Sequence, residues 1–448
     1  MTSIADVVAR QRRVLHEARP IDRRVHPDRW TASDFAGVSR EQMLASFWGA
    51  EVPGSGAYDE MLTGAVVAAA QLGWDVTGAC AALDAGWAAV DRRADVDALA
   101  GLGDVVFDAL EAGRVAGPRW DLGVDDRQTF ALLPDVEQRT LTGWQGQIAG
   151  GAFGTALEGC TGAALASVYG PITSYVGQPT ALNDDVVYEL VALAALADHG
   201  AGATTSDYAA HWSARIPFGW SAEWVVLDNL SRHVPVAHAA TVRNPMAEWI
   251  GAQMRGMVFG QLCPGEPARA ASLARVEAQV SHRNLGVEGG AFAAKLSALA
   301  YSFDDSREVV RRAELALAPS RYRQEISQLR TICESAATFD EASSRMAPIY
   351  DRYNWIHALP NIAGVIAALW FGENDFTTSF SMLARAGLDV DCNAGLVGTV
   401  LGICNAHVPS AWIDPIGDRI ETYLPSLPFV KISALTDQTL AVAANLAS

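Results

Sequence analysis

The sequence has little charge for its length and no apolar stretch long enough to cross a bilayer. Charged residues make up 19% of the 448 residues, whereas 50% are hydrophobic. No apolar run reaches the roughly 18 to 20 residues that a membrane-spanning helix needs. Residues 1–6 lack the apolar core of a signal peptide. We therefore expect a cytoplasmic protein with a large buried core and no membrane contact.

Cysteines are few, and acidic residues outnumber basic ones. The six cysteines are scattered, without a CxxC pair or the spacing of a zinc site, which predicts reduced thiols rather than a disulfide framework. Lysine and arginine number 33 against 51 aspartates and glutamates, so the net charge is −18. This balance argues against a nucleic-acid partner. It does not exclude an anionic substrate, because a bound metal can reverse the local field.

Several motifs of known chemistry are missing. No GxxxxGK[ST] sequence is present, which excludes a phosphate loop of that type. The glycine-rich stretch does not follow a strand, so it does not fit a dinucleotide fingerprint. No GxSxG nucleophile elbow occurs, and a serine-hydrolase triad therefore has no support.

Strand signals are also rare, and helical periodicity dominates. Apolar residues recur with helical spacing over 61–72, 76–90, 184–198, 269–280, 291–302 and 362–370. We therefore predict an all-α fold. Composition divides the chain into an N-terminal helical extension, residues 1–135, which ends in a connecting segment over 113–135, and a catalytic domain over 136–448.

Two acidic pairs stand at the starts of predicted helices. Asp184 and Asp185 follow Asn183, and Asp389 and Asp391 flank Val390. Acidic residues at a helix start are ordinary caps, and that interpretation stays open. The alternative is that the two pairs converge on one or two divalent cations, since Mg²⁺ and Mn²⁺ prefer carboxylate, amide and water oxygens.

A ladder of glycines precedes a single glutamate. Gly146, Gly150 and Gly154 lie four residues apart and so share one face of a helix. Each glycine costs about 1 kcal/mol of helix stability relative to alanine. That cost indicates the close approach of either another helix or a ligand. Glu158 follows the ladder in a glycine-rich turn, where it is either solvated or part of a site.

The ordered set of these motifs resembles the ADP-ribosylglycohydrolase family, of the dinitrogenase-reductase-activating glycohydrolase type. Residues 150–158 (GGAFGTALE) are close to the family pattern G-D-A-L-G-x-P-x-E, with Gly151 in the Asp place and Ala156 in the Pro place. Residues 183–186 (NDDV) match the two aspartates of T/S-D-D-T. Residues 389–394 (DVDCNA) match D-x-D-T/C-N-A.

Two further segments extend the resemblance over about 143–443. Residues 250–255 (IGAQMR) resemble the family loop that cradles phosphate, and 281–286 (SHRNLG) resemble its Ser/Thr-His segment, after a PGEP sequence at 264–267. Residues 357–361 are a further candidate wall of the same site. The expected substrate-binding residues are Gly251, Ala252, Gln253, Arg255, His282, Asn284, His357 and Asn361. The alternatives that stay open are a surface position for Arg255, a structural role for His282, and a loop turn before the next helix for His357 and Asn361.

The resemblance implies an orthogonal bundle of helices that carries two Mg²⁺ ions, or Mn²⁺, and hydrolyses the C1″ glycosidic bond of an ADP-ribosyl group. The implied metal ligands are Asn183, Asp184, Asp185 and Asp391 for one ion and Asp389, Asp391 and Glu158 for the other. Glu158 and the bridging Asp391 are the implied catalytic residues. The substrate would be an ADP-ribosylated protein or a small ribosyl nucleotide or nucleoside.

Three departures from the family pattern weigh on this interpretation. Asn183 replaces a hydroxyl residue, but its amide oxygen is a fair Mg²⁺ ligand. Cys392 replaces the commoner threonine, and a thiol is a poor ligand for a hard cation. Gly151 lacks the carboxylate that the family has. The alternative function is therefore a catalytically inactive nucleotide-binding or structural protein on the same scaffold.

Overall fold

The computed structural model of the chain describes residues 2–26, 58–90, 96–116, 125–180 and 182–447. Parts of the predicted N-terminal extension and of its connecting segment lie outside these residues. Among the described residues, the regular secondary structure is helical apart from one antiparallel pair of two-residue strands, β1 (Ile420–Glu421) and β2 (Phe429–Val430), with Ile420 opposite Val430. The prediction of an all-α protein is confirmed.

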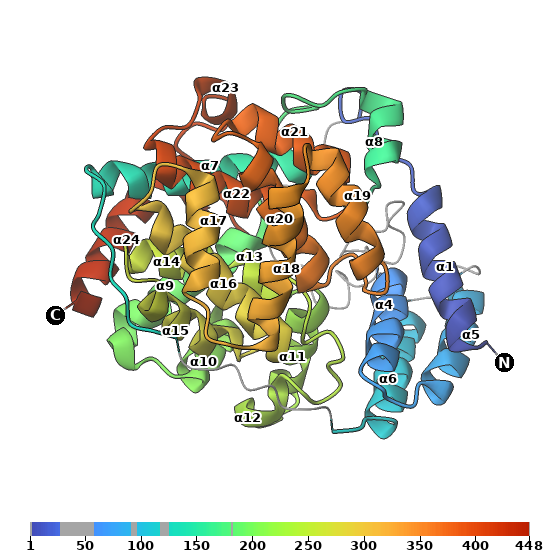
Figure 1. Cartoon of the computed structure of the whole chain (residues 1–448). Coiled ribbons are helices and arrows are strands. Elements are labelled where there is room, and N and C mark those ends of the chain that lie inside the picture. The colour runs from blue at the N-terminus through green and yellow to red at the C-terminus, as the bar shows by residue number, and fades with distance from the viewer. Residues whose placement is uncertain (1, 27–57, 91–95, 117–124, 181, 448) are drawn as a thin grey trace.

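The N-terminal helices form a group at one side of the molecule, coloured blue in Figure 1. They are α1 (Ile4–Glu17), α4 (Tyr58–Gln71), α5 (Thr77–Val90) and α6 (Val96–Ala112). α1 packs against α4, and α5 packs against α6. Their apolar side chains join one core with the rest of the chain, because the Phe107 ring of α6 lies 5.5 Å from Trp224 of α11.

The remaining helices build the body that carries the candidate site. In chain order they are α7 (Val136–Gly154), α8 (Gly162–Tyr169), α9 (Asp184–His199), the 3-10 helix η1 (Gly200–Gly202), α10 (Thr205–Arg215), α11 (Ser221–Ser231), α12 (Val236–Ala239), α13 (Gly251–Met254), α14 (Met257–Leu262), α15 (Pro267–Ala278), α16 (Asn284–Ala300), α17 (Ser306–Leu315), α18 (Arg321–Ser335), α19 (Phe339–Tyr350), α20 (Ala358–Phe371), α21 (Phe376–Ala386), α22 (Val390–Asn405), α23 (Ser410–Ile413) and α24 (Ile432–Ala447).

The centre of this body is the antiparallel contact between α7 and α22. A Cβ atom at Gly146 would lie 2.0 Å from the carbonyl oxygen of Gly398, and one at Gly150 would lie 2.0 Å from that of Ala394. At Gly154 it would lie 2.1 Å from the Cα of Asp391. The glycine ladder therefore lets two backbones touch. Of the two interpretations, the close approach of another helix or of a ligand, the first accounts for the ladder.

The predicted helices are confirmed, with two corrections to their starts. Four of the six predicted ranges match α4, α5, α9 and α15 closely. α16 begins at Asn284 instead of 291, and α20 begins at Ala358 instead of 362. Gly290, just before residue 291, does not interrupt the helix: a Cβ atom there would lie 2.7 Å from the carbonyl oxygen of Ala252, so this glycine also serves a close helix contact.

No helix in the described part of the chain is long and apolar enough to cross a membrane.

Candidate metal and substrate site

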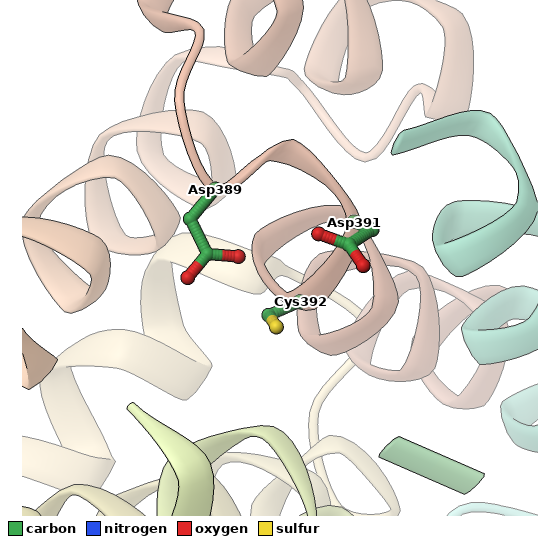
Figure 2. A group of neighbouring side chains, drawn as sticks. All are labelled: Asp389, Asp391 and Cys392. Carbon is green, nitrogen blue, oxygen red and sulfur yellow. The ribbon is translucent and has the colours of Figure 1, made fainter. Parts of the chain in front are cut away.

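Three buried side chains gather at the start of α22. Asp389 lies in the loop just before the helix, and Asp391 and Cys392 lie in its first turn (Figure 2). One ligand atom from each lies within 4.8 Å of the others. Asp389 and Asp391 are only 2% and 5% exposed. Such a close pair of buried carboxylates is unfavourable unless a cation or a proton accompanies it.

The second acidic motif meets this group from the start of α9. The Asn183 side chain accepts a hydrogen bond from the backbone N–H of Asp185 at 2.8 Å and so caps α9. Its Nδ2 donates to Asp391 Oδ2 at 3.3 Å. The Cys392 thiol lies 3.6 Å from Asp185 Oδ1. The structure therefore brings together two motifs that lie about 200 residues apart in the sequence.

The backbone before α22 is held in an uncommon conformation. Gly387 and Leu388 have φ angles of +73° and +70°. For leucine this region is unfavourable, by an amount of order 1–3 kcal/mol, and it persists only where surrounding contacts impose it. Here the Leu388 N–H donates to the Cys160 carbonyl at 2.7 Å, and the Gly159 N–H donates to the Leu388 carbonyl at 3.0 Å. These bonds fix the turn that contains Glu158, which is half-buried, beside the loop that presents Asp389.

Helix capping does not account for the acidic pair on α22. Asp389 occupies the N-cap position but accepts no capping hydrogen bond from the described residues. One carboxylate oxygen of Asp389 and one of Asp391 (Oδ1 in each) are buried without a hydrogen-bond partner in the described part of the chain. Buried polar atoms are nearly always paired, so these oxygens indicate a ligand.

The electrostatics of the cluster agree with a cation. Burial, and then the Asp391 carboxylate, raise the pKa of Asp184 to about 7. Burial followed by the neighbouring carboxylates raises the pKa values of Asp185 and Asp389 well above the usual range, and burial raises the pKa of Asp391. Divalent cations bind to ionised carboxylates and reverse this repulsion. Carboxylate and amide oxygens form the donor set that Mg²⁺ and Mn²⁺ prefer, so the residues present fit such an ion.

Cys392 is the odd member of the group. Burial, and then the Asp185 carboxylate, raise the pKa of its thiol well above the usual range, so the thiol stays protonated at neutral pH. A protonated thiol does not bind a metal as a thiolate does. Its place beside Asp185 makes it a hydrogen-bond donor to a candidate metal ligand.

Glu189 is a functional candidate that the sequence analysis missed. It is fully buried on α9, and it accepts hydrogen bonds from Gln147 Nε2 at 2.6 Å and from the Val258 N–H at 3.0 Å. Burial raises its pKa to about 8. It lies four residues after Asp185, so both point from the same face of the helix. This spacing was the signal that could have identified it.

The segment expected to cradle phosphate is buried and faces carboxylates. Gly251, Ala252, Gln253 and Met254 form the short helix α13 and are nearly inaccessible. A Cβ atom at Gly251 would lie 2.0 Å from Oε1 of Glu223. An anionic side chain packed against Gly251 disfavours a phosphate on that side of the segment. A phosphate contact of this segment stays a prediction.

Arg255 is enclosed by protein groups. Its guanidinium pairs with Glu223 at 2.5 Å and with Glu277 at 2.9 Å, and it donates to Ser281 Oγ at 2.8 Å. It also stacks over Trp212, at 4.8 Å from the ring centroid. Only 1% of Arg255 is exposed, so a substrate phosphate reaches it only by displacing a glutamate. We therefore infer a structural role for Arg255.

His282 lies beside the same cluster. Its Nδ1 is 2.7 Å from Ser281 Oγ, whereas its buried Nε2 has no hydrogen-bond partner within the described residues. Burial, with the Arg255 charge nearby, holds the pKa of His282 well below its usual range. The ring is therefore neutral at physiological pH. Its contact with a substrate remains a prediction.

Asn284, His357 and Asn361 lie together in another part of the site. Asn284 Nδ2 donates to Glu248 Oε1 at 2.9 Å, and His357 Nε2 lies 3.7 Å from Glu248 Oε2. Asn361 Oδ1 accepts from Nδ2 of Asn393, which lies two residues after Asp391, at 2.8 Å. These three predicted residues therefore share one region, and Asn361 links it to the first turn of α22. Glu248 joins them, and no motif in the sequence pointed to it.

Comparison with known proteins identifies the family of the chain. The sequence model of the ADP-ribosylglycohydrolase family matches residues 132–444, well over half of the chain. No curated protein sequence matches. A solved structure described as an ADP-ribosylglycohydrolase-related protein complex is 18% identical, over 70% of this chain and 98% of that one, with a TM-score of 0.47. On the family match, this chain belongs to the ADP-ribosylglycohydrolase family.

Proposed function

We propose that the protein is a Mg²⁺-dependent hydrolase that cleaves the glycosidic bond at ribose C1 of an ADP-ribosyl or related ribosyl nucleotide substrate. Family membership supports glycoside hydrolysis on ADP-ribosyl substrates. One observation of the structure carries the proposal further. The start of α9 and the start of α22 bring their acids together, and two buried carboxylate oxygens there lack a partner among the residues that the structure describes.

The proposed metal ligands follow from this cluster. They are Asn183, Asp184, Asp185 and Asp391 for one ion, and Asp389, Asp391 and Glu158 for a second. All offer oxygen atoms, which suits Mg²⁺ and allows Mn²⁺. Bound ions would supply polarisation of water and of ribose oxygens. Cys392 takes no part as a ligand in this proposal, since its thiol is protonated.

In the proposed mechanism the protein side chains hold the substrate and move one proton. Glu158 is half-buried, unlike Asp185, Asp389 and Asp391, so water can reach it. It accepts the proton of the water molecule whose oxygen bonds to C1. The bond from C1 to the leaving group breaks in the same step, its electron pair stays with the leaving group, and the proton passes from Glu158 to that group. The aspartates favour the positive charge that develops on the ribose ring in an oxocarbenium-like transition state. Asn183 holds Asp391 in place through its amide hydrogen bond.

A turnover assay tests the proposal. The purified protein is given an ADP-ribosylated protein and, separately, small ribosyl nucleotides, with Mg²⁺, with Mn²⁺ and with a chelator. Release of ADP-ribose or of the free ribosyl product that needs the metal supports hydrolysis. A metal-dependent thermal shift without turnover of any of these substrates contradicts it.

A second function has a specific observation in its favour. Gly151 faces the Asn183 side chain: a Cβ atom added at Gly151 would lie 3.4 Å from Asn183 Nδ2. The carboxylate that the family pattern has at this position is therefore missing beside a proposed metal ligand. A protein that binds ADP-ribose without cleaving it fits that loss. Binding of ADP-ribose in calorimetry, together with no turnover, would identify this alternative.

A further inference from the structure

A cavity of about 180 Å³ lies between the N-terminal extension and the body of the protein. Ala68, Gln71 and Leu72, from α4 and the residue that follows it, form one wall. The opposite wall includes Glu248, Asn284 and His357, two of which the sequence analysis expected to bind substrate. Almost all of the extension lies outside residues 132–444, the segment that matches the family, so the family match does not account for this wall of the cavity.

The extension is fixed in this position by contacts on both sides of the cavity. A Cβ atom at Gly64 of α4 would lie 2.8 Å from the Trp249 ring and 3.0 Å from Asn354, so the helix backbone rests directly on them. The Gln71 side chain donates a hydrogen bond to the Arg352 carbonyl. Arg12 of α1 pairs with Asp351 at 3.1 Å. The wall is thus docked on the loop that leads to His357.

The lining combines aromatic surface with one carboxylate, Glu248, and one guanidinium, Arg321. The rings of Tyr353 and His357 stack at 4.1 Å between centroids with an angle of 25° between their planes. Leu72 and the buried Trp249 add apolar surface. The Glu248 carboxylate is half-buried and accepts hydrogen bonds. Aromatic rings favour a flat partner, and a carboxylate favours one with N–H donors.

The cavity is too small for a whole substrate and lies close to the acidic cluster. Pockets for complete drug-sized ligands measure roughly 300–1,000 Å³, so this one suits a single ring system. His357 caps α20 by accepting from the Leu359 N–H at 3.1 Å, and Asn361 lies one turn, about 5.4 Å, further along. Asn361 is hydrogen-bonded to Asn393 in the first turn of α22. Hydrogen bonds through the buried Asn361 thus join the His357 wall of the cavity to the first turn of α22, which carries Asp391.

We propose that the N-terminal extension completes a subsite for a planar nitrogen heterocycle of the ribosyl substrate, and that Leu72 closes one side of it. The heterocycle lies against the Tyr353–His357 stack and donates an N–H to Glu248. This inference rests on the proposed function and deepens it. It assigns the heterocycle of the substrate to the cavity and gives the N-terminal extension a role in selecting that heterocycle.

The first test measures binding and does not require turnover. Adenosine, cytidine and ribose are titrated into the full-length protein by calorimetry in the presence of Mg²⁺. At least one nucleoside should bind, and ribose should bind at least about tenfold more weakly, the scale of a lost ring contact. If neither nucleoside binds more tightly than ribose, the subsite is refuted, even where the turnover assay shows a hydrolase.

Variants then locate the subsite. Leu72→Trp fills the cavity and should weaken nucleoside binding at least about tenfold. It should leave ribose binding and the Mg²⁺-dependent thermal shift unchanged. The matched control is Val105→Trp, the same new side chain on a 55% exposed position of α6 in the same extension. Tyr353→Ala removes half of the ring stack and should also weaken nucleoside binding, which keeps the test valid if Leu72→Trp does not fold. Equal binding by wild type and the folded variants would overturn the assignment.

Where the wild type turns over a ribosyl nucleotide, the kinetics separate the subsite from the chemistry. Leu72→Trp should raise KM with kcat nearly unchanged, since the uniform binding of the ring is lost while the reacting atoms keep their neighbours. A fall in kcat at constant KM would place the effect on the catalytic residues and contradict a binding role. The absence of turnover in the wild type would count against the proposed function and would leave the calorimetric result as the measure of the subsite.

Discussion

Adding a single methyl group at one position of the glycine ladder should separate the two central helices and disturb the acidic cluster. A Cβ atom at Gly150 would lie 2.0 Å from the Ala394 carbonyl oxygen, whereas real Cβ atoms essentially never come closer than 3.0 Å. Gly150→Ala therefore has to move α7 and α22 apart by about 1 Å. The atoms that the new Cβ would meet, in Ala394 and Gly395, all belong to the backbone, so no side-chain rotation can relieve the clash.

The free-energy cost of overpacking opposes the gain in helix propensity when alanine replaces Gly150. Overpacking of a well-packed interior costs typically about 1–3 kcal/mol, and occasionally more. Alanine regains about 1 kcal/mol of helix propensity. We expect a net destabilisation of Gly150→Ala by up to about 2 kcal/mol in urea unfolding. The separation also shifts Asp391 from Asn183, and a misplacement of about 1 Å can cost on the order of 10²-fold in rate.

The neighbouring glycine provides a matched control. A Cβ atom at Gly151 would lie 3.4 Å from Asn183 Nδ2, an ordinary contact, on the same helix. Gly151→Ala should therefore be as stable as wild type or more stable, by up to about 1 kcal/mol. Urea unfolding with and without Mg²⁺ measures both variants. If the two substitutions have the same effect on stability, the ladder does not act through the contact between α7 and α22.

Four more outcomes follow from the cluster. Asp391→Asn removes a charge from among buried carboxylates, so the metal-free protein should melt at a higher temperature than wild type, while the Mg²⁺-induced thermal shift is lost; an undiminished shift would contradict the bridging role. Glu158→Gln should lower kcat by about two orders of magnitude or more at nearly unchanged ADP-ribose affinity, as for loss of a general base; equal losses in both would make Glu158 mainly a metal ligand. Cys392→Thr should tighten Mg²⁺ binding in calorimetry, because a hydroxyl is a better neighbour for a hard cation than a thiol; weaker binding would refute this. The folded-state pKa of Asp184 is raised to about 7, so the folded metal-free protein holds this proton more tightly than the unfolded chain does. Its free energy of unfolding should therefore fall as pH rises from about 4 to 7, and a rise over that window would contradict the sign.

Much of the local structure was predictable from residue patterns. Helical periodicity identified the helices, and the acidic pairs were predicted at helix starts, where Asp184 and Asp391 lie. Patterns were less reliable where glycine serves packing. The predicted range 291–302 begins after the start of α16 at Asn284, and Gly290, between the two, lies against the backbone of Ala252. A glycine has the same letter in a turn and in a helix contact, and only the neighbouring helix distinguishes them.

Part of the candidate site was likewise predictable from the sequence, and part was not. The proposed metal ligands could be nominated from two short motifs and the family resemblance. The environment of Arg255 could not, because its partners Glu223 and Glu277 come from α11 and α15. An arginine in a loop-like motif suggests an exposed phosphate contact, and only the two buried glutamates show that its charge is already balanced. Likewise, the spacing of Glu189 from Asp185 could be read from the sequence, but its hydrogen bonds from Gln147 and Val258 depend on the tertiary structure.

The sequence alone determined that the chain is helical, that α7 carries a small-residue face and that two acidic motifs begin helices, because each of these properties depends on residues within a few turns of one another. The tertiary structure decided which backbone the small-residue face meets, where the two acidic motifs converge, and that α4 forms a wall of the cavity beside His357. These features join residues far apart in the chain, and their geometry arises from helix packing, which no local pattern encodes.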